Sequence, residues 1–271
     1  YEAGLSISKS AVSFKRTRKY ERVRLFYGNS RWPVFMQVVV KGDVFFTDTL
    51  LAHVNYAVSE CDLPDSVNSI SINFSGFDSP DIYGIELASD SGLIMDNIAL
   101  RGSSGLVFTK NDFEHSRKMY SDLNPGLFIL QFGGNIMPYI TNKSAIKKYG
   151  YRFKKEVERI QHLCPDAAII IIGPSDMSTK EKDRYVTYPH LPDVVETLQN
   201  VALSSGCGFW NMYEAMGGKN SMPGWVNSEP ALARPDYTHF SSRGARLVAN
   251  MFYNALILEY NNYLEENQQK K

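Results

Sequence analysis

Residues 1 to about 95 consist of short apolar or alternating runs that are separated by turn residues. Examples are "YERVRLFYG" (20–28), "PVFMQVVVKGD" (33–43) and "SISINFSG" (69–76). Alternation over four to eight residues is typical of β-strands with one buried face. The stretch 82–100 has the pattern of two more strands, joined by a turn at Asp90-Ser91-Gly92. We therefore expect an antiparallel β-sandwich over residues 1–92.

The pattern changes after about residue 95, where strands and helices alternate. Apolar runs that end in glycine, at 127–133 and 167–173, are typical of buried parallel strands, and "CGFWNM" (207–212) predicts a third strand. The spacing of apolar residues predicts helices over 143–165, 192–206 and about 241–265. This alternation favours a parallel sheet with helices on both faces, in which ligands bind beyond the carboxyl ends of the strands. We expect this α/β domain to span residues 93–271.

The charge balance of the chain argues against an electrostatic partner. Lysine plus arginine and aspartate plus glutamate number 29 each, so no net charge would attract nucleic acid or an anionic membrane. No apolar run is long enough to span a bilayer. The cysteines, Cys61, Cys164 and Cys207, are odd in number and lack metal-ligand spacing. No P-loop, dinucleotide glycine fingerprint or HExxH motif occurs. We therefore expect no nucleic-acid partner, no metal and no organic cofactor.

An aspartate and a histidine, Asp236 and His239, lie three residues apart just before the last predicted helix. One turn can present both side chains on the same side, and a carboxylate that orients a histidine is a feature of Ser-His-Asp hydrolases. The alternative interpretation is structural, because the motif is short. Asp236 would then cap a turn, and His239 would be an ordinary hydrogen-bonded residue.

Two earlier loops favour the catalytic interpretation. In "LQFGGN", Asn135 follows a buried strand and two glycines, so its side-chain amide could donate to a developing oxyanion. In "LRGSSG", the backbone N–H of Gly102 could be a second donor. Both residues also have structural alternatives, as members of ordinary strand-end or glycine turns.

The order of a glycine loop, an asparagine loop and Asp-x-x-His resembles the SGNH (GDSL-type) hydrolases over about residues 95–262. In detail the chain is similar to bacterial envelope enzymes related to peptidoglycan O-acetylesterases. The similar blocks are "DNIALRGSSG", "FILQFGGN", "IIGPSDMSTK", "GCGFWNMYEAMGGKNSMPGWV" and "PDYTHFSSRGARLVANMFYNAL". The resemblance implies a flavodoxin-like, three-layer hydrolase domain, into which the sandwich is inserted as a module like those that bind carbohydrate. It also implies that Asp236 is the catalytic acid and His239 the base, with an oxyanion hole made by Gly102 and Asn135.

The function that the resemblance implies is that of a serine esterase. It would remove O-acyl groups, acetyl above all, from an acylated glycan in the periplasm or outside a bacterial cell. Two alternatives stay open at this point: a glycan-binding protein without catalysis, and an O-acyltransferase that uses the same site.

The nucleophile of that family lies in a Gly-Asp-Ser motif, which does not occur here. Ser30, in Gly28-Asn29-Ser30, is a weak candidate, because a strand follows where the family has a helix, and a hairpin turn is the favoured interpretation. Ser91 lies too close to the glycine loop, while Ser103 and Ser104 lie inside it. The chain begins at Tyr1 rather than at a methionine, and we expect a preceding segment to carry the serine and the first strand of the sheet.

Two further loops are candidates for substrate contacts. Ser175 and Asp176 follow the predicted strand at 167–173, where they could line a pocket or could serve as turn and capping residues. Asn220 and Trp225 lie in the glycine-rich loop 216–226, which has the composition of a lid or of a wall that stacks on sugars.

Overall fold

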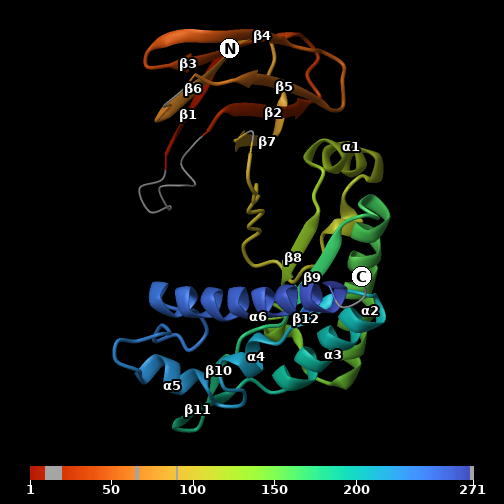
Figure 1. Ribbon diagram of the computed structural model, residues 1–271, viewed down its shortest axis with the longest axis vertical. Coiled ribbons are helices and arrows are strands. Elements are labelled where there is room, and N and C mark those ends of the chain that lie inside the picture. Colours follow the sequence, from red (N-terminus) through yellow and green to blue (C-terminus); the bar gives the residue numbers. More distant parts are fainter. Residues whose placement is uncertain (10–19, 65–66, 90, 269–271) are drawn as a thin grey trace. The chain divides into compact units, whose positions relative to one another are not determined.

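The computed structural model describes residues 1–9, 20–64, 67–89 and 91–268, and it divides the chain into two compact units. The first unit comprises residues 1–99 and 114–122, and the second comprises 100–113 and 123–271. Figure 1 labels the elements of both. The first unit therefore contains a helix that lies beyond the predicted domain boundary at residue 92.

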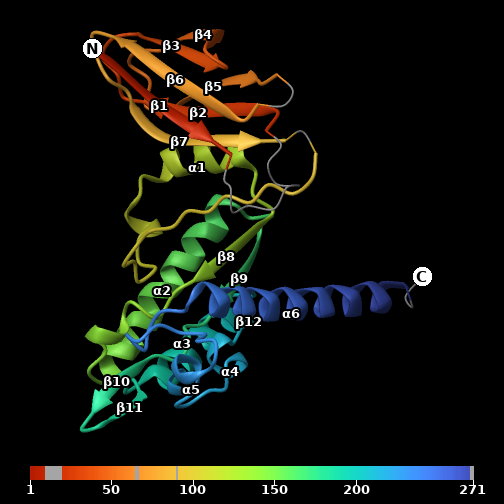
Figure 2. The same ribbon diagram turned by 90° about the vertical axis from the view of Figure 1, so that its left-hand side faces the viewer.

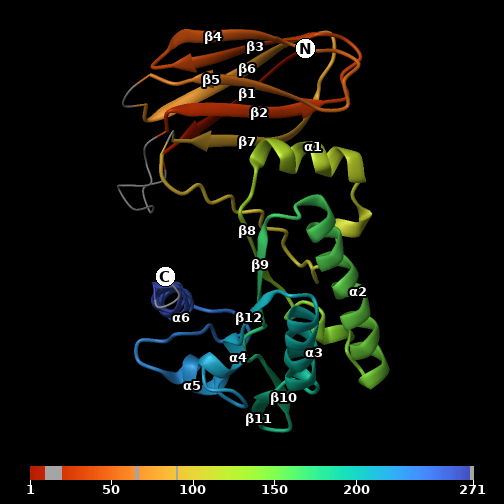
Figure 3. The ribbon, with the colours of Figure 1, turned by 45° about the vertical axis from the view of Figure 1, so that its right-hand side comes forward.

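The first unit is built from two antiparallel sheets. One has the order β1-β6-β3-β4 and the other the order β5-β2-β7. These strands are β1 (Glu2–Ser8), β2 (Arg22–Gly28), β3 (Val34–Val40), β4 (Asp43–Leu50), β5 (Ala57–Asp62), β6 (Ser69–Gly76) and β7 (Asp81–Ala88). Alternate residues of both sheets, such as Leu25 of β2 and Ile72 of β6, share one core, as in two-layer β proteins. Figure 3 shows the two layers.

Two expectations for this unit are wrong. Gly28–Ser30 does not form a hairpin turn, because β2 and β3 belong to different sheets and the segment links them. Residues 93–100 form no strand, and all of residues 91–100 are exposed. Asp90, at the turn predicted there, lies outside the described residues. An apolar pattern becomes a strand only when a neighbour satisfies its backbone groups, and the described structure gives 93–100 no such neighbour.

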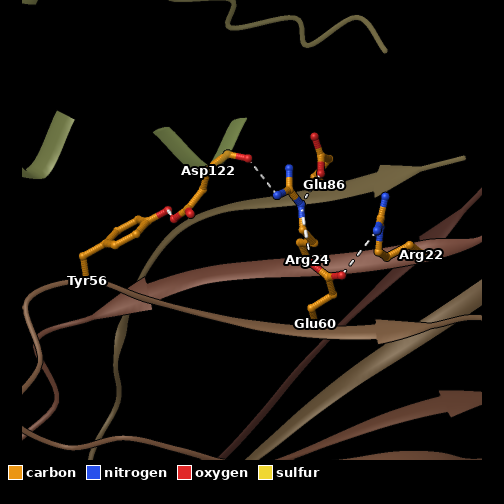
Figure 4. Close-up of polar contacts among 6 residues, drawn as sticks. All are labelled: Arg22, Arg24, Tyr56, Glu60, Glu86 and Asp122. Atoms are coloured by element: carbon orange, nitrogen blue, oxygen red, sulfur yellow. Dashed lines mark hydrogen bonds and ion pairs between the residues drawn. The ribbon is translucent and has the colours of Figure 1, made fainter. Parts of the chain in front are cut away.

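Helix α1 (Phe113–Leu123) packs on the first unit through a polar cluster that Figure 4 shows. The Arg24 guanidinium donates to Glu86 at 2.5 Å and to the Asp122 backbone oxygen at 2.9 Å. The Tyr56 hydroxyl donates to the Asp122 carboxylate at 2.7 Å. A cation near the last carbonyls of a helix is favourable, because those oxygens lack partners within the helix. The cluster therefore explains why a helix without buried residues joins this unit.

The second unit contains the predicted parallel sheet, with the order β12-β9-β8. Its strands are β8 (Leu127–Gln131), β9 (Ala168–Ile172) and β12 (Gly208–Trp210). Its long helices are α2 (Lys143–Leu163), α3 (Leu191–Ser204) and α6 (Ser242–Gln268). In Figure 3, α2 and α3 lie on one side of this sheet and α6 lies on the other, which is the three-layer order that we expected. The predicted bounds of all six elements agree with these to within a few residues.

Shorter elements of the second unit were not predicted. They are the 3-10 turns η2 (Phe108–Lys110) and η3 (Met137–Tyr139), the hairpin of β10 (Ser178–Glu181) and β11 (Arg184–Thr187), and the helices α4 (Met212–Ala215) and α5 (Met222–Asn227). The main core of the unit lies between the sheet and α2 and α3, and it includes the fully buried Phe153, Val157 and Ile171.

Two surfaces of the second unit leave apolar side chains in solvent. Strand β8 stands at the edge of its sheet, and its Leu127 and Ile129 are 41% and 44% exposed. Helix α6 runs beyond the other elements of this unit, as Figure 2 shows, and Gly244 is its one buried residue among those described. Within the described ranges, no helix has both the length and the apolar character that a membrane crossing would need.

Candidate active site

The loop that carries Asp236 and His239 is closed at its base before α6 begins. Ala233 and Phe240 form a β-bridge, and the Arg234 backbone N–H donates to the His239 carbonyl at 2.8 Å. Ser241 caps the helix, since its Oγ accepts from the Gly244 N–H at 3.1 Å. A short loop fixed at both ends holds its side chains in a defined orientation.

The structure brings Asp236 and His239 together as a hydrogen-bonded pair. Oδ2 of Asp236 lies 2.9 Å from Nδ1 of His239. The other oxygen, Oδ1, accepts from the backbone N–H groups of Thr238 and His239 at 3.0 and 2.9 Å. The His239 side chain is 72% exposed, so the ring nitrogen that does not face Asp236 is accessible from solvent. This is the geometry of a carboxylate that orients a general base.

The environment of Asp236 keeps its carboxyl group ionised. Partial desolvation acts to raise its pKa, but the hydrogen bonds from the backbone and ring of His239 and from the Thr238 N–H outweigh it. The pKa of Asp236 is therefore lower than that of a free aspartate. An ionised partner favours the tautomer of His239 that carries its proton on Nδ1.

The two predicted oxyanion residues also lie on adjoining loops. Nδ2 of Asn135 donates to the Ser103 carbonyl at 3.0 Å, and Ser103 directly follows Gly102. A primary amide carries two N–H groups, so this bond leaves one for a second acceptor. Gly102 has φ +72° and is exposed, and a Cβ there would meet no atom within 4 Å. The positive φ explains the glycine, because other residues rarely adopt that conformation.

A residue of helix α2 holds the loop that contains Gly102 and Gly105. The hydroxyl of the buried Tyr149 donates to the Ser104 carbonyl at 2.9 Å, and the Gly105 N–H donates to Ser103 Oγ at 3.1 Å. A Cβ on Gly105 would lie 2.7 Å from the Phe132 ring, so the loop can approach the core only with glycine there. Tyr149 was not predicted as a site residue. The sequence signal that could have found it is a tyrosine within the apolar stripe of a predicted helix. A buried tyrosine hydroxyl usually has a hydrogen-bond partner, which such a position would indicate.

Asp176 lies below the surface, where it organises the loop after β9. Its carboxylate accepts from the Thr187 hydroxyl at 2.7 Å and from the Met222 N–H at 2.8 Å, and the residue has no exposed surface. This placement favours the structural alternative over direct substrate contact. Its neighbour Ser175 is half-buried.

Trp225 and Asn220 are likewise engaged within the protein. The Trp225 indole donates to the Met216 carbonyl at 2.9 Å, and its ring lies 5.4 Å from that of Phe240, which follows His239. Asn220 Oδ1 accepts from the Thr187 N–H at 2.9 Å. Trp225 is buried and packs against Phe240, so it supports the loop that carries the Asp–His pair.

The in-chain serine Ser30 is buried in the first unit, where its hydroxyl donates to the Leu51 carbonyl at 3.2 Å. A buried, hydrogen-bonded hydroxyl is not accessible to a substrate. In the parts of the chain that the structure describes, no group of three or more His, Cys, Asp or Glu side chains could hold a metal ion. Cys61, Cys164 and Cys207 are free.

Comparison with known proteins concerns the fold. No protein-family model matches the chain, and no curated protein matches it. A solved structure of a peptidoglycan O-acetylesterase aligns with 97% of this chain and 78% of its own, with a TM-score of 0.70 and 19% identity. An acetyl xylan esterase aligns with 54% of this chain and 76% of its own, at a TM-score of 0.38 and 14% identity. The periplasmic domain of a lipopolysaccharide acetyltransferase from Salmonella ser. Paratyphi A aligns with 52% of this chain and 60% of its own, at a TM-score of 0.37 and 16% identity.

The first of these likenesses is the informative one. It extends over 97% of the chain, so it includes residues of both compact units. In the second unit, Asn135 lies in the loop after β8, and Asp236 and His239 lie in the loop before α6, as the sequence predicted. The chain therefore has the fold of that peptidoglycan O-acetylesterase structure.

Proposed function

We propose that the protein is an esterase that removes O-acetyl groups from a glycan of the bacterial cell envelope, in the periplasm or outside the cell. The observation that carries this proposal is the Asp236–His239 pair, whose second ring nitrogen is accessible from solvent. The Asn135–Ser103 contact supports this proposal, because it holds the Asn135 amide close to Gly102. The second N–H of that amide and the Gly102 N–H are donors suited to an oxyanion. The glycan and the location are suggested by the likeness to a peptidoglycan O-acetylesterase.

The proposed reaction is acyl transfer in two steps. His239 takes the proton of a serine hydroxyl while the serine oxygen attacks the ester carbonyl. Gly102 N–H and Asn135 Nδ2 stabilise the resulting oxyanion, and His239 gives its proton to the departing sugar oxygen. Water then attacks the acyl-serine with His239 again as base, which releases acetate and regenerates the serine. Transfer to a sugar hydroxyl in place of water would make the protein an acyltransferase, which product analysis distinguishes.

We further propose that the serine lies in a segment that precedes Tyr1. A strand that ends near Asn135 and Gly102 would have to run beside β8, and that strand presents an open edge with half-exposed Leu127 and Ile129. An edge strand leaves one row of backbone N–H and C=O groups without strand partners, and a further strand would bond to them.

Fluorophosphonate labelling, followed by intact mass and peptide mapping, tests both parts of the proposal. It would be applied to residues 1–271 and to the native gene product with any residues that precede Tyr1. We expect label only on the longer form, at a serine upstream of Tyr1, and we expect His239→Ala to abolish labelling there. Labelling at Ser30 would contradict the placement of the nucleophile. A folded longer form without label would contradict catalysis and favour a glycan-binding protein.

A further inference from the structure

The residue that directly follows Asp236 has an unusual backbone conformation. Tyr237 has φ +55°, in the left-handed region that residues other than glycine rarely adopt. Such a conformation persists only where the surrounding contacts hold it. Because Tyr237 lies between Asp236 and His239 in the chain, a change in its backbone would move the carboxylate relative to the imidazole. The contacts that hold Tyr237 therefore bear on the geometry of the pair.

The hairpin of β10 and β11 makes two contacts with Tyr237. The ring of Tyr185, in β11, stacks on the ring of Tyr237, with 3.5 Å between the centroids and 8° between the planes. The N–H of Ser178, the first residue of β10, donates to the Tyr237 carbonyl at 2.9 Å. The hairpin therefore holds both the side chain and the backbone of the residue between the two members of the pair.

The strand that carries Tyr185 is itself fixed to the interior of the second unit. Thr187 lies two residues further along β11, so its side chain points to the same face of the hairpin as that of Tyr185. The Thr187 hydroxyl donates to the buried carboxylate of Asp176 at 2.7 Å and accepts from the Asn220 N–H at 2.7 Å. The Asn220 side-chain oxygen accepts from the Thr187 N–H in return. Asp176 and Asn220 therefore fix the strand from which the Tyr185 ring projects.

We propose that Tyr185 is a positioning residue for the Asp236–His239 pair and that it acts through Tyr237. Its ring holds the Tyr237 ring in place, and Tyr237 in turn keeps the left-handed turn that sets Oδ2 of Asp236 against Nδ1 of His239. Tyr185 is 38% exposed, so its substitution removes this contact at the surface rather than a member of the main core. The inference deepens the proposed function, and its consequence for catalysis rests on that function.

The first measurement is the tautomer of His239, read from the ring ¹⁵N chemical shifts of residues 1–271 at about pH 9, where a histidine ring is normally neutral. The His239→Gln variant assigns the signals. We expect the proton on Nδ1 in the native chain, because Asp236 accepts it. Tyr185→Ala should shift the proton toward Nε2, and Tyr185→Phe, which keeps the ring, should restore the native spectrum. This measurement needs no serine nucleophile, so it decides the positioning even if the labelling experiment refutes catalysis.

The second measurement is kinetic and uses the form of the protein that fluorophosphonate labels. Tyr185→Ala should lower kcat for an acetyl ester about two- to tenfold, the factor by which the loss of one aromatic pair shifts an equilibrium. KM should change little, because the orientation of the pair affects the chemical step rather than substrate binding. In a Tyr237→Ala background, Tyr185→Ala should cause no further loss, since the contact through which it acts is already absent.

The same hairpin supplies a matched control. Arg184→Ala removes the exposed side chain next to Tyr185 in β11, and it should leave both the His239 spectrum and kcat unchanged. Thermal melting would check that each variant is folded. A native tautomer in folded Tyr185→Ala would overturn the inference, as would an equal effect of Arg184→Ala or a further loss in the Tyr237→Ala background.

Discussion

At the scale of single residues, the carboxylate of Asp236 carries the sharpest prediction. Asp236→Asn keeps the shape of the side chain but places an amide opposite the Nδ1–H of His239, which favours the wrong tautomer. If the proposed mechanism holds, we expect kcat/KM for an acetyl ester to fall by about 10³- to 10⁴-fold in the form of the protein that fluorophosphonate labels, because the same substitution has an effect of this size in Ser-His-Asp enzymes. Steady-state kinetics on a chromogenic acetyl ester would measure it.

The chain contains a matched control for this substitution. His190 and Asp193 form a second pair with the same spacing, at 3.0 Å, at the start of α3. Asp193→Asn should leave kcat/KM unchanged, because that pair lies outside the proposed mechanism. Equal losses in both variants would show that the effect is a general one on the fold, and no loss in Asp236→Asn would remove Asp236 from the mechanism.

Contacts between side chains can be predicted from the sequence most readily where the two residues are close in the chain. Asp236 and His239 are three residues apart, so one turn suffices to join them. Asn135 and Ser103 are 32 residues apart, and the contact between them depends on how β8 and the glycine loop pack. The role of Tyr149 was missed because its hydroxyl donates a hydrogen bond to a backbone carbonyl. Every residue has such a carbonyl, so the sequence does not indicate which one is the partner.

At the scale of elements, the position of the Asp–His loop depends on how α6 begins. A Cβ on Gly244 would clash with the backbone oxygen of Leu232, an atom that cannot move without the loop. We expect Gly244→Ala to lower the free energy of unfolding by about 1–3 kcal/mol and to reduce kcat. Chemical denaturation and kinetics would measure the two effects. Gly224→Ala in α5 is the control, since its Cβ would meet no atom within 4 Å, and destabilisation by both variants alike would contradict the argument.

The sequence predicted elements best where burial imposes a period. Helix α2 shows this, because its stripe from Ile146 to Leu163 is buried against the sheet and α3. Helix α1 was missed because none of its residues is buried, and its place depends on polar contacts with Arg24 and Tyr56. Residues 93–100 show the opposite error, since an apolar pattern predicted a strand that the described structure does not contain.

At the scale of the whole molecule, the sequence changes pattern near residue 95, and the structure divides into two compact units. The change of pattern did not indicate that residues 114–122 would belong with the first, because contacts rather than chain order define a unit. Each hydrophobic core draws its members from one unit alone. Separate cores allow separate unfolding transitions, which is a common departure from two-state behaviour in chains of this kind.

We therefore expect residues 1–271 to unfold in two steps by calorimetry. Ile72→Ala, in the core of the first unit, should lower the stability of one transition by about 2–5 kcal/mol and leave the other in place. Ile171→Ala should do the reverse, because Ile171 is fully buried in the core of the second unit. A single transition that both substitutions shift equally would mean that the units stabilise each other. In that case a ligand of the first unit would also stabilise the second unit, since ligand binding would then be linked to the unfolding of both.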